Sequence, residues 1–227
     1  VRALEELQAA ENELESSRAE PSGRLRLTAP VDVGHNAVPA LVHRYLELHP
    51  RMEVELIITN RVLDLLGEGI DLAIRAGELK DSGLIARRFE LGQFCLWASP
   101  EYLSIHSAPR HPKEFTRHRC LRLSQFKNNR IRISNDKETV SLPAEGRLMA
   151  DDFETIRALA ILGEGIAFLP SFLCSEEIKQ HKLVRVLPQW RGDKVFLSLV
   201  YPPQRFVPAK IRAIIAVAEE LWKKRTL

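Results

Sequence analysis

Several small or polar residues and one aromatic residue lie near the ends of predicted strands or the starts of predicted helices in this chain. Backbone N–H groups are unpaired at such junctions, and the helix dipole there favours polar or anionic groups. Hydroxyl, amide and guanidinium groups at these points can therefore bind a small polar molecule. The candidate binding residues are Thr28, Ala29, Pro30, Thr59, Asn60, Arg75, Ser99, Asp152 and Phe153.

Each of these residue types also has a purely structural interpretation. Thr28, Thr59 and Asp152 are of the types that cap helices, which contributes about 1 kcal/mol to a helix and nothing to a ligand. Phe153 is equally consistent with a core aromatic. Arg75 ends a predicted strand, where it can clamp a carboxylate or form an internal ion pair. Asp152 adds a negative charge, which argues against a strongly anionic ligand.

Motifs of catalysis are missing from the sequence. It contains neither a Gly-x-Ser-x-Gly elbow nor a His-Glu-x-x-His helix. His106, His111, His118 and Cys120 lie near one another in the chain, but their spacing matches no common zinc site. We therefore expect no enzyme activity, no metal and no cofactor.

Composition indicates a globular protein of one large domain or two small ones, with 227 residues of which 45% are hydrophobic. The 33 basic and 30 acidic residues leave a net charge of +3, too weak a bias for a nucleic-acid surface. Cys95 and Cys174 lie among apolar neighbours, as expected of buried thiols in a reducing compartment. The sequence shows no signal peptide and no apolar run long enough for a bilayer, which predicts a cytoplasmic protein.

Residues 1–18 are rich in Glu, Ala and Leu, contain no Gly or Pro, and have apolar residues near a heptad seam. This pattern predicts a linker or dimerisation helix, which a turn at 20–23 ends. Beyond it we expect strands at 25–30, 54–59, 71–75, 94–97, 120–123, 131–133, 165–170, 183–187 and 195–201. Helices are expected at 38–48, 62–66, 154–162, 174–179 and from 208 onward. Strands alternating with helices over short links are typical of a parallel sheet covered by helices.

One short motif occurs twice, as Leu-Gly-Glu-Gly-Ile at 66–70 and again at 162–166. Phosphate-binding loops lead from a strand into a helix, whereas here each copy lies between a predicted helix and a following strand. We therefore interpret the motif as a helix C-cap that is repeated in two similar halves.

Longer motifs follow one another in the order of a known family. They are GRLRLTAP at 23–30, LDLLGEGIDLAIRAG at 63–77, LKDSGLIARR at 79–88, ASPEYL at 98–103, HRCL at 118–121, GEGIAFLP at 163–170 and YPP at 201–203. In these residues the chain resembles the LysR-type transcriptional regulators, within the branch often called CrgA-like. The resemblance covers nearly the whole sequence.

The resemblance implies an α/β fold of the periplasmic-binding-protein-like kind (type 2), with two α/β subdomains joined by two crossing strands and a ligand cleft between them. Subdomain I would comprise residues 23–98 plus 200–227, and subdomain II residues 99–199. Residues 1–20 would be the linker and dimerisation helix. The winged helix-turn-helix with which the family begins is absent from this sequence, so this chain by itself is not expected to read DNA.

The resemblance also implies a function, namely effector sensing and oligomerisation within a DNA-binding transcription factor. The family's effector contacts map onto Thr28, Thr59, Ser99 and Phe153. The expected partners are a small organic acid, aromatic or quinone-like effector and further copies of the chain, as a homodimer, tetramer or higher oligomer. DNA would be bound only through the missing helix-turn-helix, and no membrane contact is expected. Helix 38–48 is the candidate dimer surface, although its apolar stripe is equally compatible with packing against its own sheet. A solute-binding protein and an enzyme on the same fold are the alternatives.

Overall fold

The computed structural model describes residues 20–77, 83–124, 130–204 and 206–223, so the helix expected at 1–18 lies outside the described residues. The chain divides into two compact units, the first from residues 1–90 and 196–227 and the second from residues 91–195. Both boundaries fall inside strands, β4 (Ile85–Ala98) and β11 (Lys194–Tyr201). Two strands therefore connect the units. In the described part of the chain, no helix has the length and apolar character needed to cross a membrane.

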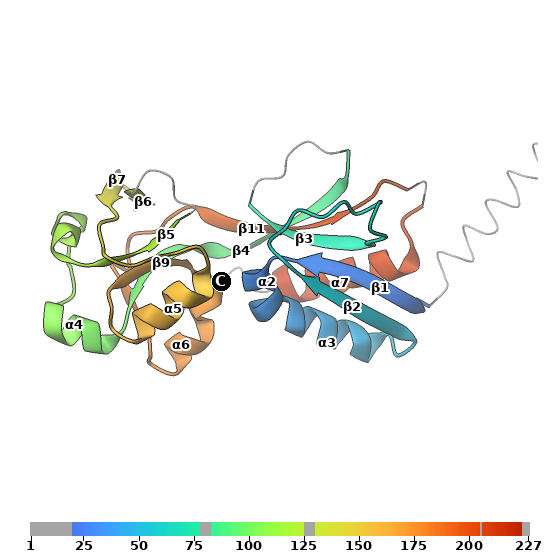
Figure 1. Ribbon diagram of the computed structural model, residues 1–227, viewed down its shortest axis with the longest axis horizontal. Coiled ribbons are helices and arrows are strands. Elements are labelled where there is room, and N and C mark those ends of the chain that lie inside the picture. Colours follow the sequence, from blue (N-terminus) through green and yellow to red (C-terminus); the bar gives the residue numbers. More distant parts are fainter. Residues whose placement is uncertain (1–19, 78–82, 125–129, 205, 224–227) are drawn as a thin grey trace, which may run out of the picture. The chain divides into compact units, whose positions relative to one another are not determined.

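The first unit is built on a mixed sheet with the strand order β2–β1–β3–β11. Strand β1 (Gly23–Ala29) runs parallel to both β2 (Met52–Ile58) and β3 (Leu72–Ala76), and β11 runs antiparallel to β3. The helices of this unit are α2 (Val31–Asn36), α3 (Val38–Leu48) and α7 (Ala209–Lys223). Figure 1 shows α3 and α7 packed together on one side of this sheet.

Alternation along β1 assigns its side chains to the two faces of the sheet. Leu25 and Leu27 are completely buried in the core. Arg26 and Thr28 point to the opposite face. There the segment 63–70 packs against the sheet through a small apolar cluster. The buried members of that cluster are Leu65, Ile70, Ala73 and Val200.

The helix expected at 62–66 is wrong, because this segment forms turns. The Asp64 side chain accepts the N–H of Leu66 at 3.1 Å, and the Asp64 carbonyl accepts the N–H of Glu68 at 3.0 Å. Gly69 then adopts a positive φ of 63°, and the turn ends at this residue. The first Leu-Gly-Glu-Gly-Ile motif is therefore not a helix C-cap. The second one does follow a helix, and its Gly163 has a φ of 79°.

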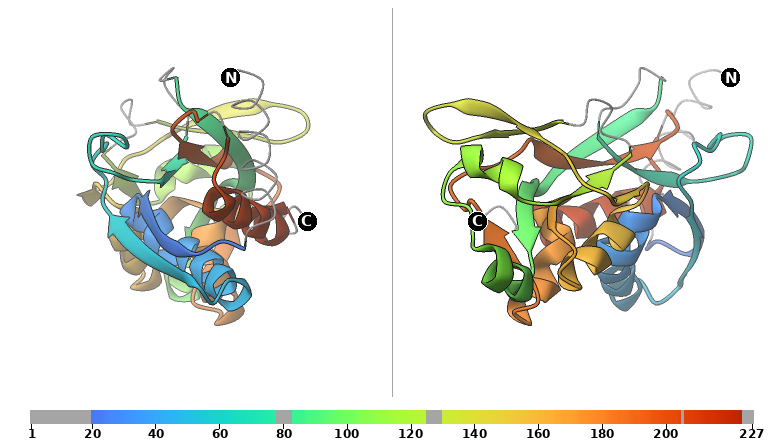
Figure 2. Two further views of the ribbon diagram at one scale, coloured as in Figure 1. Left: turned by 90° about the vertical axis from the view of Figure 1, so that its right-hand side faces the viewer. Right: turned by 60° about the vertical axis from the view of Figure 1, so that its left-hand side comes forward.

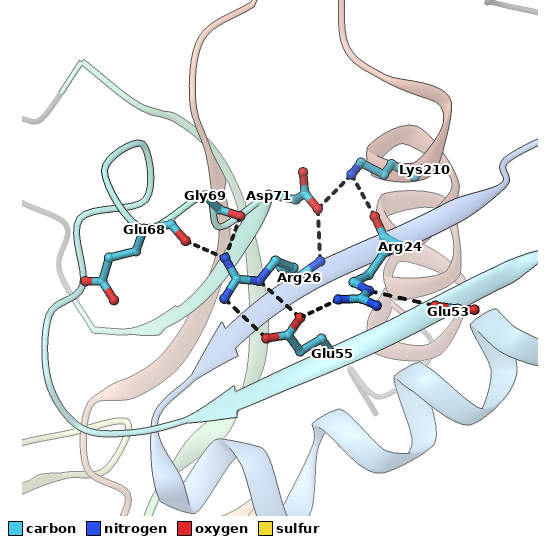
Figure 3. A network of polar contacts seen from close by, with 8 residues as sticks. All are labelled: Arg24, Arg26, Glu53, Glu55, Glu68, Gly69, Asp71 and Lys210. Carbon is cyan, nitrogen blue, oxygen red and sulfur yellow. Dashed lines mark hydrogen bonds and ion pairs between the residues drawn. The ribbon is translucent and has the colours of Figure 1, made fainter.

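A polar network fastens this segment to the sheet (Figure 3). Arg26 donates from Nε and from a terminal nitrogen to the two carboxylate oxygens of Glu55, at 3.1 and 3.2 Å, and also donates to the Glu68 carbonyl. Asp71 accepts the backbone N–H of Arg26 at 2.9 Å and the Lys210 ammonium at 2.7 Å. The network thus joins β1, β2, the 64–71 segment and the beginning of α7.

The second unit contains a sheet in which β9 (Ile166–Pro170) lies between β4 and β5 (Cys120–Leu123). Strand β8 (Met149–Ala150) pairs with β5, and β10 (Val184–Val186) pairs with β4. A separate hairpin is formed by β6 (Arg130–Ser134) and β7 (Thr139–Pro143). The helices are α4 (Pro100–His106), α5 (Phe153–Ile161) and α6 (Ser175–Lys179), with 3-10 turns η1 (Pro112–Arg117) and η2 (Ser171–Cys174).

This second sheet is buried on both faces, so its strands are apolar without interruption. Cys95, Trp97 and Leu169 belong to a core that includes Ile156 of α5. Leu96 and Phe168 alternate with them and belong to another core, which the β6–β7 hairpin and α4 complete. Figure 2 shows the hairpin, in yellow, away from α5 across this sheet. The expected α/β class and the expected strands are confirmed, as are the other helices in the described residues.

Replacing Arg26 by Met keeps the aliphatic stem of the side chain and removes its hydrogen bonds. We expect the free energy of unfolding to fall by about 1–2 kcal/mol, because the carboxylate of Glu55 and the loop carbonyls lose a charged donor. Urea denaturation at pH 7 measures this change. Arg24→Met is the matched control, since the Arg24 side chain is 62% exposed, and it should cost less than about 0.5 kcal/mol. Equal losses in the two variants would contradict the role given to Arg26.

Candidate functional site

Thr28 lies near the carboxyl end of β1 and is completely buried. Its hydroxyl donates to the carbonyl of Ile57 on the neighbouring strand at 2.9 Å. It does not cap a helix, because the residue at the start of α2 is Pro30 and no side chain caps that end. A hydroxyl that donates once keeps lone pairs that can accept. Thr28 can therefore still receive a hydrogen bond from a ligand.

Thr59 and Asn60 lie beside the end of β1, because the parallel strands β1 and β2 end at the same edge. The N–H of Thr59 donates to the Ala29 carbonyl at 2.9 Å, which continues the pairing by one residue. The Asn60 side chain accepts the N–H of Val31, the first residue of α2, at 3.0 Å. The structure therefore brings the predicted residues 28–30 and 59–60 together, and Asn60 already satisfies one N–H of the helix.

Arg75 lies near the end of β3 and faces Ser198 of β11 in the strand register. It is two residues beyond Ala73, which pairs with Thr28, so Arg75 and Thr28 lie on the same face of the sheet. Within the described residues Arg75 makes no hydrogen bond or ion pair. Burial lowers the pKa of its guanidinium below the usual value. This partly buried cation is available to an anion.

Ser99 and Asp152 both cap helices of the second unit. The hydroxyl of Ser99 accepts the N–H of Tyr102 at 3.1 Å at the start of α4. One carboxylate oxygen of Asp152 accepts the N–H of Thr155 at 2.7 Å at the start of α5. The capping interpretation is confirmed for Asp152, and Ser99 has the same role although it is only 3% exposed.

The carboxyl group of Asp152 is held in its ionised form. Its partial burial acts to raise the pKa, but hydrogen bonds from Thr155 and from the backbone of Glu154 and Asp152 outweigh that effect and lower the pKa below 3.8. A carboxylate that caps a helix also interacts favourably with the helix dipole. Both effects stabilise the start of α5.

Phe153 packs half-buried against the core that contains α5. Its ring centroid lies 6.0 Å from that of Phe94, which in turn is stacked on Phe168 at 5.1 Å. Phe94 and Phe168 are neighbours of Phe153 that the sequence did not predict, although both lie in expected strands. Only strand pairing brings them together, since Phe94 pairs with Pro170 near the end of β9.

An open depression of about 630 Å³ lies on the second unit beside the β6–β7 hairpin. Its charged lining residues are Asp136, Lys137, Arg191, Asp193 and Lys194, and none of the predicted site residues borders it. Charges of both signs give it no preference for an anion. Across the described ranges, no group of three or more His, Cys, Asp or Glu side chains is placed to hold a metal ion.

Replacing Asp152 by Ala removes the cap of α5. We expect the variant to be about 1 kcal/mol less stable than the wild type at pH 7. Because the folded-state pKa is lowered, this difference is fully present above pH 3.8 and disappears as pH falls through the folded pKa. Urea denaturation at several pH values measures it. Asp152→Asn keeps an acceptor and should stay close to the wild type at pH 7, whereas an unchanged stability of Asp152→Ala would exclude the capping role.

Known proteins resemble this chain over most of its length. Residues 18–223 match the LysR substrate binding domain family. The transcriptional regulator PtxR of Pseudomonas aeruginosa is 32% identical over 220 residues, which are 96% of this chain and 70% of PtxR. The regulator CrgA of Neisseria meningitidis is 30% identical over 222 residues, which are 97% of this chain and 74% of CrgA.

Solved structures agree with these relatives. The structure of CrgA from Neisseria meningitidis superposes with a TM-score of 0.78 at 29% identity, covering 97% of this chain and 76% of CrgA. The expected periplasmic-binding-protein-like fold of LysR regulatory domains is thereby confirmed. The chain belongs to the LysR-type transcriptional regulators, in the branch that contains CrgA, and carries their LysR substrate binding domain.

Proposed function

We propose that this chain senses a small effector molecule and assembles its regulator into an oligomer, while a helix-turn-helix outside this sequence contacts DNA. The family match supports an effector-binding regulatory domain. Regulators of this kind act on DNA, so we place the protein in the cytoplasm. The sequence left two alternative functions open, a solute-binding protein and an enzyme on the same fold. No specific observation favours either of them.

The observation that carries the effector proposal is the position of Arg75 beside Thr28. The guanidinium lies on the same sheet face as a buried hydroxyl and makes no ion pair in the described ranges. Arginine binds carboxylates through two parallel hydrogen bonds. Among organic acids, aromatics and quinones, this pair therefore favours an effector that carries a carboxylate.

Each unit contributes its own set of proposed effector contacts. Thr28, Thr59 and Arg75 would bind its polar end, and Ser99 and Phe153 are the contacts proposed from the second unit. An aromatic body of the effector suits the ring of Phe153, which already packs against Phe94. Asp152 is engaged as a cap, so its carboxylate would act on the effector mainly through its charge.

Thermal unfolding with a panel of small carboxylates and their neutral amide counterparts tests this proposal. A carboxylate at a hundred times its dissociation constant adds about 2.7 kcal/mol of stability. This corresponds to a rise in Tm of roughly 5–10 °C for a chain of this size. We expect Thr28→Val and Arg75→Gln to abolish the rise, because they remove the hydroxyl and the guanidinium that bind the carboxylate.

Thr139→Val and Arg61→Gln are matched controls with exposed side chains, and they should keep the full rise. Each variant is compared with its own melting temperature without ligand, so a loss of intrinsic stability does not confuse the result. A rise that the amides produce equally, or that persists in Arg75→Gln, would exclude the carboxylate contact. No rise with any compound would count against effector sensing by this chain.

The surface that we propose for oligomerisation is the exposed side of α3 and the edge strand β2. Leu46 and Leu48 of α3 are 37% and 44% exposed, and Leu56 of β2 is 42% exposed. Strand β2 ends the sheet of the first unit, so its outer edge has no partner strand in the described residues. Apolar side chains beside an open strand edge favour association with another chain.

We expect the double variant Leu46→Glu, Leu56→Glu to shift the protein toward monomer, because buried unpaired carboxylates oppose association. Multi-angle light scattering measures the mass of the assembly. Val62→Glu is the control, since Val62 is 89% exposed on a loop of the same unit. An oligomer that survives in the double variant would place the interface elsewhere.

A further inference from the structure

A polar cluster that the proposed function does not use lies in the second unit, between α4 and the start of β5. It consists of Tyr102 and His106 from α4 and of His118 and Arg119 from the segment that precedes β5. The ring of Tyr102 is only 1% exposed and belongs to the core beneath the hairpin. Its hydroxyl lies 3.0 Å from the backbone N of Arg119 and 3.2 Å from Nδ1 of His118.

Hydrogen-bond roles in this cluster follow from the chemistry of the groups. The backbone N–H of Arg119 can only donate, so the Tyr102 oxygen accepts this bond. The Tyr102 proton is then free to point to Nδ1 of His118, which accepts it only when that nitrogen carries a lone pair. The Tyr102 oxygen could also accept from a protonated Nδ1, but the buried hydroxyl proton would then lose the one acceptor that the described residues offer it, so the chain of bonds favours the neutral imidazole with its proton on Nε2.

His106 is subject to the same restriction. Its Nε2 lies 3.4 Å from a terminal nitrogen of Arg119, and a guanidinium has no acceptor. Nε2 of His106 must then be the acceptor in this contact. The His106 ring packs on Tyr102, with ring centroids 4.6 Å apart. The Nε of Arg119 is buried and has no hydrogen-bond partner among the described residues, which is unfavourable for this cation.

Positive charge therefore accumulates around Tyr102 when the pH falls. The pKa of His118 is lowered first by burial and then by His106, while Glu114 of η1 acts in the opposite direction without cancelling them. Glu164, on the loop that touches α4 and Arg119, already pairs with Arg147 at 3.1 Å. The other charged side chains on the packed elements are Glu101, Lys113, Arg117 and Arg119. Glu114 is thus the acidic group that favours protonation of His118, and burial and His106 outweigh it.

We propose that Tyr102, His106, His118 and Arg119 form an acid-sensitive latch, which holds α4 to the start of β5 near neutral pH and releases it when His118 is protonated. Protonation of His118 removes the acceptor of the buried Tyr102 proton, and it places a further cation beside Arg119. Both changes oppose the closed arrangement. The latch works within the second unit and does not require an effector.

The pH range of the latch follows from the sign of the shift. An unfolded histidine has a pKa near 6.5, and that of His118 lies below this value in the folded protein. The stabilising contribution is therefore complete above pH 6.5 and is lost as pH falls through the folded pKa. Helix α4 begins at Ser99, so release of the helix would also loosen a proposed effector contact. That last connection, unlike the latch, rests on the proposed function.

Amide hydrogen exchange of the peptide that covers α4, followed between pH 5 and 7.5 and corrected for the intrinsic exchange rate, tests the latch. We expect protection of α4 in the wild type to fall with pH, by roughly tenfold for each pKa unit that separates folded from unfolded histidine. The double variant His106→Gln, His118→Asn keeps acceptors near the positions of Nε2 and Nδ1 but cannot be protonated. Its protection should stay constant over this range.

His43→Gln is the matched control, because His43 is an exposed histidine of the first unit, and it should behave like the wild type. Protection of α4 that does not change with pH in the wild type, or that falls equally in the double variant, would overturn the latch.

A second measurement needs no variant and holds even if the double variant does not fold. Titration of the wild type labelled with 13C-histidine should show one partly buried imidazole, that of His118, whose pKa lies below 6.5. Tyr102→Phe, which removes the hydroxyl, should move that pKa back toward 6.5. Ordinary titration of every histidine, or an unchanged pKa in Tyr102→Phe, would exclude the hydrogen-bond chain on which the proposal depends.

Discussion

Parallel pairing of β1 with β2 and β3 is the constraint on which the candidate site of the first unit depends. Parallel strands end at the same edge of a sheet, so the pairing brings residues 28–30 beside residues 59–60. Alternation along the strands then puts Thr28 and Arg75 on one face. The site of the first unit therefore follows from strand direction and register, and its residues need not be close in the chain.

Arg26 and Arg75 differ in the electrostatic interactions that their guanidinium groups make. Arg26 shares that polar face, yet its guanidinium is used by Glu55 and by loop carbonyls, so it organises the 64–71 segment. Arg75 is partly buried, and burial lowers its pKa, because a desolvated cation without a partner is costly. Two residues of the same type on one sheet face thus differ in the interactions that they make, because their neighbours differ.

Burial on both faces gives the second unit a different organisation. Alternate residues of β4 and β9 belong to two separate cores, one with α5 and one with the hairpin and α4. Ser99 and Asp152 begin the two helices that cover these opposite cores. Their capping bonds fix where each helix starts, so a variant at either position changes the helix as well as any ligand contact. Tyr102 reaches from the buried core to the polar groups that precede β5, and it thereby couples packing to protonation.

The sequence by itself determined the family, the α/β class and most strands and helices of the described residues. It could do so because apolar periodicity and motifs are local properties, which can be identified without knowledge of contacts.

The sequence failed at 62–66, where the Asp64 side chain and Gly69 favour turns over a helix whose propensity was a weak signal. It also left several candidate site residues, Thr28, Asp152 and Arg75 among them, with two interpretations. Only the tertiary structure decided that Asp152 caps a helix, that Thr28 does not, and that Arg75 lacks an ion pair among the described residues. The physical reason is that the role of a polar side chain depends on which groups from distant segments contact it. Strand pairing and packing determine those contacts.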